Sequence, residues 1–563
     1  MDSSLRSKNA ESTGNRQRVK ISRRNFVKSI GVAAGSLLLG DGLAGEGFGQ
    51  SKPGEPIETL EVVLPNSTPC IEGVRLIVEQ WRKLGLDVRY TPMPSSALLP
   101  KIYNRDYRHL AYMVWPALPE RYDPGFWLTE FYHSSNAKPG GRNWGDYINP
   151  RLDTVLDQQE QELDTEKRRE AVLRAQAIAA EDHPIWYTVY PNLFSAYNKK
   201  RWDGWVNMIG APPQSPNNLW NMVSITPKTA QKIFVWAQNI DLATRNPFTQ
   251  AVAPTQGIVR FVYDRFFQIS PDLKVVPWAA ESWKWVDKTT LDIRIRKDMS
   301  FHDGKPVTPE DAAFSFDYFL KYNMPRYGLV TKNLKGVKLL ETGDIRLYLK
   351  NPSASYVGSA LVWAHILPKH IWEDVSRPME FEDPKMIGSG PFALKDWKKG
   401  EAFLFTAHKT HFSKPKMDGF YYIIIPALQN QIGMLEKGDI DILGYEGLQY
   451  SQAKDLAKHP DLSYMTTEGI GFYELRPRVK VKPFDDLQFR KALHYAIPKR
   501  EILKVAHEEQ GVLGHNTPIT PRNRIWHNDK IPYVEFNMNE SKRMLEKAGY
   551  FRNPEGKLCY PGK

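Results

Sequence analysis

The sequence predicts an α/β protein, and three observations lead to this fold class. Runs with β-propensity alternate with amphipathic helical segments along the chain. Residues 58–90 follow a strand–helix–strand order, and the run 421–425 is continuously apolar, as in a strand that is covered on both faces. The body of the chain contains no repeat of solenoid length and no low-complexity tract. We therefore expect helices packed in layers on β-sheets.

The first predicted elements lie close to the start of the body. Residues 59–64 have the composition of a short strand. Apolar residues then recur at helical spacing over 71–85, and Gly85 ends this helix. A second strand follows at 88–90, and a later helix, 164–182, is rich in Ala, Glu and Arg. This order is typical of a β-α-β unit followed by a helical layer.

Elements of the second half are predicted in the same way. Residues 232–237 are β-prone, and 291–295 alternate as a half-buried strand does. Asp485 and Asp486 can cap a helix that continues to Ala496. These elements predict further α/β layers in this part of the chain.

Two stretches interrupt the predicted elements. Residues 45–57 are rich in Gly, Pro and Ser, and residues 206–230 are rich in Pro, Asn and Ser. Such composition is typical of connecting segments, so we expect both to be linkers.

Length and charge restrict the class of protein. The chain has 563 residues, of which 41% are hydrophobic and 25% charged, as in soluble globular proteins. The ten-residue apolar run 30–39 is too short for a bilayer, which needs about 20 residues. The net charge is +12, but residues 1–44 hold eight Lys/Arg and only three Asp/Glu. No stripe of basic residues indicates a nucleic-acid partner.

Residues 1–44 have the features of an export signal. Arg23 and Arg24 precede the apolar run 30–39, which resembles a twin-arginine signal peptide and implies the twin-arginine translocase as a partner during export. The alternative is a basic tail followed by a short helix. No Cys lies directly after the apolar run, so we expect a mature protein that is free in the periplasm and carries no lipid anchor.

No pattern in the sequence indicates catalysis. The signatures GxSxG, HExxH and GxGxxG and the phosphate-binding loop are absent. His408 and His411 have the spacing of a metal pair, but no third ligand lies nearby in sequence, and surface histidines are the simpler interpretation. We therefore expect a binding protein with no cofactor and no metal, rather than an enzyme.

Several motifs carry a resemblance to a known family. They are Ala280-Glu-Ser-Trp-Lys-Trp-Val-Asp, Leu291-Asp-Ile-Arg-Ile-Arg, Phe301-His-Asp-Gly-Lys-Pro-Val-Thr-Pro-Glu-Asp, Ile366-Leu-Pro-Lys-His, Gly388-Ser-Gly-Pro-Phe, Leu435-Glu-Lys-Gly-Asp-Ile-Asp, and Pro483-Phe-Asp-Asp with Arg490-Lys-Ala-Leu-His-Tyr-Ala. Jointly they resemble the substrate-binding proteins of ABC importers of the peptide/nickel type, extracellular solute-binding family 5. As scaffold motifs, the His302-Asp-Gly304 turn and a cap at Thr308 or Asp311 are expected to start a helix.

The resemblance implies a type II periplasmic-binding-protein fold with two α/β lobes and an extra subdomain in the first lobe. The order of the segments differs from the family, because the stretch Gly145-Asp-Tyr-Ile-Asn-Pro-Arg-Leu-Asp and the helix after it belong near the family's C-terminus. We therefore expect a circular permutation, with a domain-swapped dimer as the alternative.

The permuted fold implies a division of the chain into seven segments. A signal peptide (1–44) and a linker (45–57) come first. The second lobe is built from two separate segments, 58–195 and 471–563. The core of the first lobe is likewise built from two, 196–275 and 386–470, with the extra subdomain (276–385) between them.

The permutation predicts that the segments 555–563 and 58–70 are spatial neighbours. Cys70 and Cys559, the two cysteines of the chain, then lie close together. In an oxidising compartment a disulfide between them is possible if their Cα atoms are no more than about 7 Å apart.

The resemblance also implies where a solute is held. In peptide-binding relatives a Trp on a cleft loop is followed by an Asp that holds the ligand's α-amine; Trp115 matches, but Pro116, Ala117 and Leu118 stand where that Asp is expected. The departure argues against an ordinary peptide ligand. Core packing is the alternative for Trp115, and a structural role is the alternative for Trp127 and Asp123. The predicted ligand-binding residues are Trp115, Asp123, Trp127, Asn239, Asp241, Phe472 and Tyr473.

The function implied is that of a monomeric periplasmic receptor which closes on a small solute and delivers it to the permease subunits of an ABC importer. Peptide-like solutes, oligosaccharides and opine-type metabolites remain open, and the mild basicity of the body favours anions. The alternatives are a sensory binding subunit, and an enzyme or chaperone on the same fold.

Overall fold

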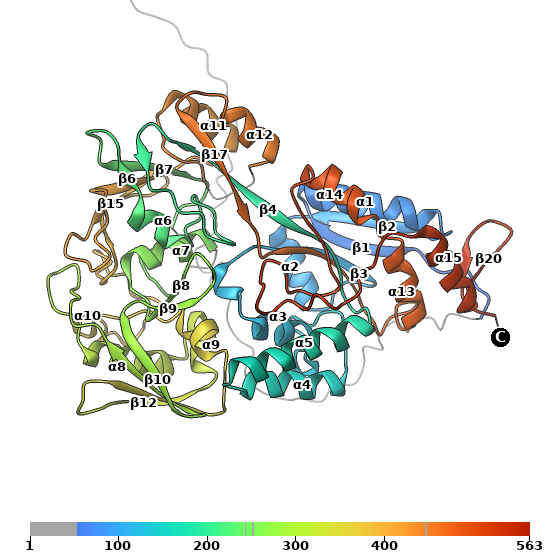
Figure 1. The fold of residues 1–563 in the computed structure, drawn as a ribbon, viewed down its shortest axis with the longest axis horizontal. Helices are drawn as coiled ribbons and strands as arrows, with labels where there is room; N and C mark the ends of the chain where they lie inside the picture. Colours follow the sequence, from blue (N-terminus) through green and yellow to red (C-terminus); the bar gives the residue numbers. More distant parts are fainter. Residues whose placement is uncertain (1–52, 243, 250–252, 445–447, 563) are drawn as a thin grey trace, which may run out of the picture. The chain divides into compact units, whose positions relative to one another are not determined.

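A seven-stranded sheet unites the two ends of the described chain (Figure 1). The computed structural model describes residues 53–242, 244–249, 253–444 and 448–562. The predicted signal peptide, with Arg23 and Arg24, lies outside these residues. The strands of the sheet follow the order β17-β4-β18-β3-β1-β2, with β19 paired to β4. Their bounds are β1 (Leu60–Pro65), β2 (Val88–Met93), β3 (Leu110–Trp115), β4 (Trp186–Asn198), β17 (Leu462–Glu468), β18 (Phe472–Pro477) and β19 (Gly511–Leu513).

Helices cover both faces of this sheet, because its strands alternate their side chains between two apolar cores. In β3, Leu110 and Tyr112 join one core while Ala111, Met113 and Trp115 join the other. The first core is completed by α1 (Thr68–Arg82), α13 (Leu487–Tyr495), α14 (Lys499–His507) and α15 (Met538–Lys547). The second core is completed by α2 (Ser95–Tyr103), α3 (Pro124–Tyr132), α4 (Pro150–Gln161) and α5 (Thr165–Glu181).

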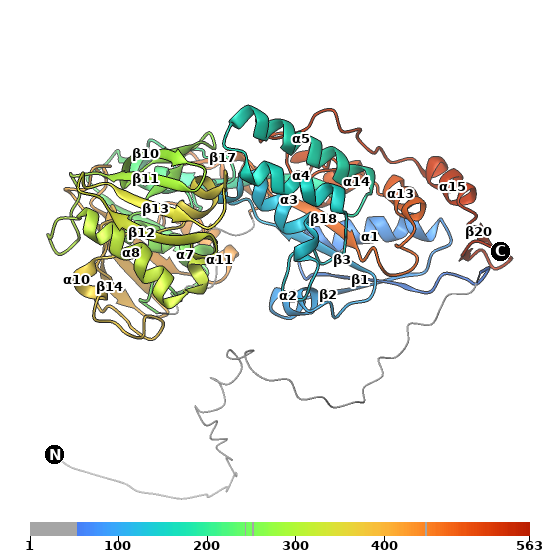
Figure 2. The same cartoon turned by 90° about the horizontal axis from the view of Figure 1, so that it is seen from below.

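The middle of the chain forms two four-stranded sheets. One has the order β14-β15-β16-β7, and the other has the order β10-β11-β13-β12, which Figure 2 shows side by side. The bounds are β7 (Ile233–Gln238), β14 (Phe392–Lys398), β15 (Ala402–Ala407), β16 (Gly419–Ile424), β10 (Ala280–Asp287), β11 (Thr290–Ile295), β12 (Leu334–Leu339) and β13 (Ile345–Leu349). The helices here are α6 (Leu219–Ser224), α7 (Ala253–Val262), α8 (Pro309–Tyr322), α9 (Gly328–Thr331), α10 (Lys369–Trp372), α11 (Leu428–Lys437) and α12 (Tyr450–Leu456).

Short elements complete the chain. They are η2 (Pro119–Arg121), η3 (Ser134–Asn136), η4 (Pro325–Tyr327), η5 (Tyr356–Leu361), and the paired strands β5 (Trp202–Asp203) with β6 (Thr226–Pro227), β8 (Phe267–Ile269) with β9 (Val275–Pro277), and β20 (Phe551–Arg552) with β21 (Leu558–Cys559).

The backbone crosses between the seven-stranded sheet and the middle of the chain along β4 and again along β17 and β18. The first half of β4 pairs with β18 and β19, whereas its second half pairs with β17. Tyr197 at the end of β4 and Trp236 of β7 both form bridges with Ile442. We call residues 58–195 and 471–563 the seven-stranded lobe and residues 196–470 the four-stranded lobe, into which β17 and the end of β4 extend the larger sheet.

The C-terminal hairpin β20–β21 lies beside the start of β1. The Ile57 amide donates to the Leu558 carbonyl (2.8 Å), and the Leu558 amide donates to the Gly85 carbonyl (2.9 Å). The Tyr560 hydroxyl donates to Glu58 (2.8 Å). Gly85 has φ +88°, and a Cβ there would lie 2.4 Å from the Gly556 carbonyl oxygen, so this close approach requires glycine. The expected neighbourhood of 58–70 and 555–563 is confirmed.

The disulfide, in contrast, is not formed, because Cys70 and Cys559 are both free and buried. Cys70 is on α1 and belongs to the apolar core between this helix and the sheet. The Cys559 sulfur contacts the Lys557 carbonyl within the edge hairpin. The two thiols therefore have different surroundings, and the disulfide that the sequence allowed does not link them.

Most local predictions are confirmed within three residues. α1, α5, β7, β11 and α13 occupy the predicted segments. Asp164 and Asp486 cap α5 and α13, and Thr308 and Asp311 form a capping box at α8. These features depend on neighbouring residues alone, which is why the sequence predicts them.

Two predictions need correction. The segment 206–230 is not a free linker, because Asn218 caps α6 and its amide nitrogen donates to the carbonyls of Val206 and Ala211. Strand β16 is not covered on both faces, since the Tyr421 side chain is 41% exposed. Its apolar run reflects two neighbouring strands, β15 and β7, rather than two covering layers.

Candidate functional site

Three of the predicted ligand residues belong to one aromatic cluster inside the seven-stranded lobe. Trp115, Trp127 and Phe472 are all buried. Trp115 stacks on Trp144 with ring centroids 5.5 Å apart, and its indole nitrogen donates to Glu474 (3.2 Å). Trp127 meets Trp115 and Phe472 edge to face. These contacts place the three side chains in the packing between sheet and helices.

The other predicted residues have protein partners that account for most of their polar atoms. Asp123 caps α3 through the Gly125 amide and forms a buried ion pair with Arg168 (2.7 Å). Asp241 accepts from the Trp397 indole (3.1 Å) and the Gly400 amide (2.6 Å).

Asn239 and Tyr473 differ from these carboxylates. The side-chain oxygen of Asn239, which follows β7, is buried and accepts no hydrogen bond within the part of the chain that the structure describes. Tyr473 packs edge to face on His507 with ring centroids 4.6 Å apart, and burial raises the pKa of its hydroxyl. Asn239 is therefore the predicted residue that keeps an unused polar atom.

The lobes meet at a buried carboxylate. Glu120 lies on η2, five residues after the end of β3, and is 3% exposed. It pairs with Arg260, from α7 of the four-stranded lobe, and with Arg265, which follows α7 (2.8 Å). The Arg260 guanidinium also donates to the Asn217 carbonyl (2.7 Å) and to the Asn217 side chain (2.9 Å).

A third arginine adds positive charge to this junction. The three guanidinium nitrogens of Arg326, on η4, are buried and meet no acceptor with hydrogen-bond geometry within the described residues, although the Tyr327 hydroxyl lies close enough to act on this guanidinium. Its charge acts on Arg265 and on His365. We call Arg260, Arg265 and Arg326 the arginine cluster.

Electrostatics at the junction follow from burial and from this excess of arginine. Burial alone would raise the pKa of Glu120, but the charges of Arg260 and Arg265 outweigh it and hold that pKa at about 2. Burial, together with Arg260, lowers the pKa of Arg265 to about 9 despite the attraction of Glu120. Burial and the three arginines lower the pKa of His365 well below its ordinary value, so this ring is neutral at pH 7.

A second polar contact joins the lobes. Ser353 and Ser355 of the four-stranded lobe both donate to the Glu160 carboxylate, at 2.6 and 2.5 Å, and the Ala354 amide donates to the Glu160 carbonyl (2.7 Å). Burial raises the pKa of Glu160. A cavity of about 440 Å³ beside this contact is lined from both lobes, by Phe126 and Glu160 on one side and Ser353 and Tyr356 on the other.

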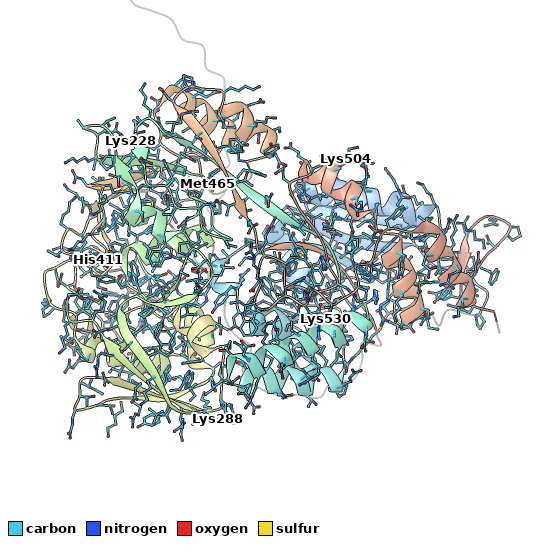
Figure 3. The ribbon with its side chains drawn as sticks, viewed as in Figure 1. Lys228, Lys288, His411, Met465, Lys504 and Lys530 are labelled. Carbon is cyan, nitrogen blue, oxygen red and sulfur yellow. The ribbon has the colours of Figure 1, made fainter. Side chains whose placement is uncertain are left out.

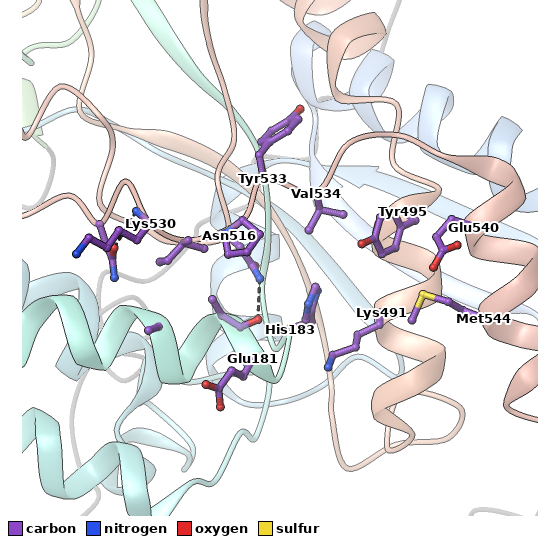
Figure 4. Close-up of a pocket in the computed structure, with 15 residues that line it drawn as sticks. Glu181, His183, Lys491, Tyr495, Asn516, Lys530, Tyr533, Val534, Glu540 and Met544 are labelled. Atoms are coloured by element: carbon purple, nitrogen blue, oxygen red, sulfur yellow. Dashed lines mark hydrogen bonds between the residues drawn. The ribbon is translucent and has the colours of Figure 1, made fainter.

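A further cavity of about 430 Å³ lies within the seven-stranded lobe (Figure 4). His183, Lys491, Asn516, Tyr533 and Glu540 are among the residues that line it. Since only one lobe contributes to it, closure of two lobes cannot enclose a solute there. The junction between the lobes, with Glu120 and the arginine cluster and with the Glu160 contact and its cavity, is therefore the candidate functional site.

Within the described residues, no group of three or more metal-ligating side chains is arranged to hold an ion. His411, labelled in Figure 3, is not a surface residue as expected but is 3% exposed and paired with Asp264 (3.1 Å). No described helix combines the length and the apolar character needed to cross a membrane.

Comparison with known families adds to this geometry. A sequence model described as "Bacterial extracellular solute-binding proteins, family 5 Middle" matches residues 274–559, half of this chain. The chain belongs to family 5. The predicted fold class is confirmed, as two α/β lobes of the type II periplasmic-binding-protein fold.

Curated relatives match over part of their length. The oligopeptide-binding protein AppA of Bacillus subtilis (strain 168) is 29% identical over 318 residues, which cover 54% of this chain and 57% of AppA. The heme-binding protein A of Haemophilus influenzae is 26% identical, covering 51% and 56%. The dipeptide-binding protein of Escherichia coli (strain K12) is 25% identical, covering 49% and 55%. The chain thus spans little more than half the length of these relatives.

Solved structures of binding proteins match part of the chain. AppA from Bacillus subtilis in complex with a nonapeptide has 25% identity and a TM-score of 0.46, covering 60% of this chain and 68% of that one. NikZ from Campylobacter jejuni in complex with Ni(L-His) has 22% identity and a TM-score of 0.46, covering 60% and 66%.

Sequence reasoning missed the residues of the candidate site. Arg260, Arg265 and Arg326 have no motif spacing, and the fold alone brings them to Glu120. One signal was available, because Glu120 follows closely on the stretch Pro116–Leu118 that departs from the family pattern.

Proposed function

We propose that this family 5 protein is a periplasmic receptor that binds a small solute between its two lobes and delivers it to an ABC importer. The observation that carries the proposal is the character of the junction between the lobes. Its ion pairs and hydrogen bonds are made by Glu120 and Glu160 on one side and by arginine and serine side chains on the other, beside a smaller apolar contact of Ala117 and Tyr122. A polar junction can open to water at much lower cost than an apolar core. The relatives named above are likewise binding proteins, which supports a receptor rather than an enzyme.

Movement of the lobes is supported by the two crossovers. Hinge closure needs few connections between two rigid bodies, and here β4 and the pair β17–β18 provide them. Permease subunits of the importer would then recognise the closed form.

Native mass spectrometry tests the receptor role. The protein, purified from the periplasm without unfolding, is expected to carry one small molecule, which unfolding in urea and dialysis remove. A second sample of the native protein is heated, which releases its bound small molecules into solution. Adding this small-molecule fraction is expected to raise the melting temperature of the refolded protein, because a ligand stabilises the state it binds. A native mass equal to that of the bare chain, with no thermal shift on adding that fraction, would contradict the proposal.

We further propose that the chain is circularly permuted and monomeric. The order of the strands supports the permutation. Strands β1 to β3 come before the four-stranded lobe in sequence and β18 comes after that lobe, yet all four strands belong to one sheet. The hairpin β20–β21 is hydrogen-bonded to Ile57. The segments expected from the sequence, including the extra subdomain 276–385, are proposed with the same bounds.

A rearranged gene tests the permutation. It joins residue 562 to residue 53 through a short Gly/Ser linker and opens the chain in the exposed stretch 228–232, beside Lys228 of Figure 3. We expect the rearranged protein to fold as a monomer with a melting temperature close to that of the parent. An unfolded product would contradict the permutation, and a dimeric parent in light scattering would favour the swapped arrangement.

Export by the twin-arginine route is proposed on the motif alone. Replacing Arg23 and Arg24 by lysine is expected to leave the protein in the cytoplasm. Unchanged periplasmic yield would contradict this route.

A further inference from the structure

We infer that the solute is an oxoanion whose carboxylate or phosphate group is held by the arginine cluster of Arg260, Arg265 and Arg326. The inference rests on the proposed function, because it names the class of solute for the same site. It follows from charge balance, from nitrogens that lack partners, and from a contrast with other buried ion pairs of this chain.

Charge balance comes first. Glu120 is the one carboxylate that pairs with the cluster among the described residues, so three guanidinium groups and one carboxylate leave a net charge of +2. His365 beside them is neutral, and its ring accepts from Arg265 and lies 2.8 Å from the Tyr327 hydroxyl. Burying uncompensated charge is costly, which favours an additional anion at this place.

Unpaired donors point to the same conclusion. Nη2 of Arg265, Nε of Arg260 and the three nitrogens of Arg326 are buried and have no hydrogen-bond partner in the described structure. Buried polar groups in folded proteins almost always have a partner, so such a concentration of free N–H donors indicates an absent acceptor. Guanidinium groups present planar pairs of donors that match the two oxygens of a carboxylate or phosphate.

The cluster is also held in position for binding. The Arg265 guanidinium lies over the Trp363 ring, 5.0 Å from its centroid, and Arg260 is held by Asn217. Glu120 keeps one oxygen, Oε2, without a partner among the described residues, and this oxygen can accept from a hydroxyl or ammonium group of the same solute. Because Glu120 and the arginines come from different lobes, a solute that contacts both would stabilise the closed form.

Two other buried ion pairs of this chain, by contrast, match one arginine to one carboxylate. Arg476 pairs with Glu474 through both carboxylate oxygens, at 2.8 and 2.9 Å. Arg168 pairs with Asp123 in the same way. Each of these arginines, which stabilise the fold, has a carboxylate of its own, whereas none of the described carboxylates pairs with Arg326.

Two measurements on the purified full chain test the inference. First, the small-molecule fraction released by heat from the native protein is applied to a strong anion-exchange resin at pH 11, where any amino group is neutral and a solute with a carboxylate or phosphate group is expected to be retained. Second, titration calorimetry uses succinate, citrate, inorganic phosphate, trialanine, trialanine amide and maltotriose. At least one oxoanion is expected to bind, and Arg326→Gln is expected to weaken it at least tenfold. Arg377→Gln, which removes the same charge at a largely exposed position, is expected to leave the affinity within twofold.

The possible outcomes separate the two proposals. If the released solute passes through the resin, or if trialanine amide or maltotriose binds the parent and Arg326→Gln equally well, the receptor role stands and the oxoanion is overturned. If no solute is released and no compound binds, both proposals fail. The preference between phosphate and carboxylate follows from which of the panel binds. A folded, ligand-free Arg326→Gln protein should melt at or above the parent temperature; a fall of several degrees would assign Arg326 to the fold and overturn the inference.

Discussion

Two buried regions only a few residues apart in sequence differ in how their polar atoms are matched. Behind Trp115, aromatic rings pack on one another, and the Glu474 carboxylate pairs with the Arg476 guanidinium. Around Glu120, three guanidinium groups share one carboxylate, and several nitrogens have no partner within the described residues. The comparison teaches that an aromatic residue next to a predicted cleft can belong to the apolar core. An excess of buried positive charge, by contrast, indicates the proposed solute site.

The largest expected effect concerns the aromatic region. Trp115→Ala removes a buried indole and its hydrogen bond to Glu474, and should lower the free energy of unfolding by about 4 kcal/mol. Urea unfolding measures this loss. Trp115→Phe, which keeps an aromatic ring, should lose much less. If Trp115→Ala instead keeps its stability and loses the bound solute, the residue belongs to the site and the comparison fails.

The junction should respond differently to the removal of its carboxylate. Glu120→Gln leaves Arg260 and Arg265 without their counter-charge, and should cost about 3 kcal/mol of stability in the absence of solute. Added phosphate or citrate should restore much of the melting temperature, because an anion replaces the lost charge. A comparable rescue of Trp115→Ala by the same salts would contradict the contrast between the two regions.

The pH dependence of Glu120 has a defined sign. Its folded pKa is about 2 and its ordinary value is 4.5, so its contribution is present above about pH 4.5 and is lost as the pH falls toward 2. The difference in unfolding free energy between the parent and Glu120→Gln should be constant above about pH 5, near 3 kcal/mol on the scale of about 1.4 kcal/mol per pKa unit. It should shrink as the pH falls below 4.5. A difference that grows on acidification would be the opposite sign.

The smallest expected loss of stability concerns a third region, where the two ends of the described chain meet. Gly85→Ala forces a Cβ against the Gly556 carbonyl at positive φ, and should cost about 2 kcal/mol. Gly140 has nearly the same φ, +81°, and open space around it, so Gly140→Ala should cost only the backbone strain, about 1 kcal/mol. Equal losses for both variants in urea unfolding would mean that the hairpin β20–β21 does not depend on this close approach.

The sequence predicts local features of this fold better than its site. The caps at Thr308 and Asp486 depend on adjacent residues, so patterns suffice. The burial of Trp115 was also accessible, because alternation along β3 places residues 111, 113 and 115 on one face of the sheet.

The arginine cluster could not be predicted in that way. Arg260 and Arg326 are 66 positions apart, and Glu120 comes from a segment that precedes both by more than 100 residues. Only the fold brings η2, α7 and η4 together, and only the geometry reveals which nitrogens lack a partner among the described residues. Charge balance at the junction is a property of the tertiary structure.

The most direct test of the central claim is a distance measurement between the lobes. Spin labels at Lys288→Cys, in the four-stranded lobe, and Lys504→Cys, on α14, occupy exposed positions that Figure 3 shows, while Cys70 and Cys559 are buried. Double electron–electron resonance is recorded on the refolded, solute-free protein and again after the heat-released small-molecule fraction is restored. A solute-receiving clamp predicts a shift of the distance distribution to one narrower population. The same distribution with and without that fraction would contradict the account.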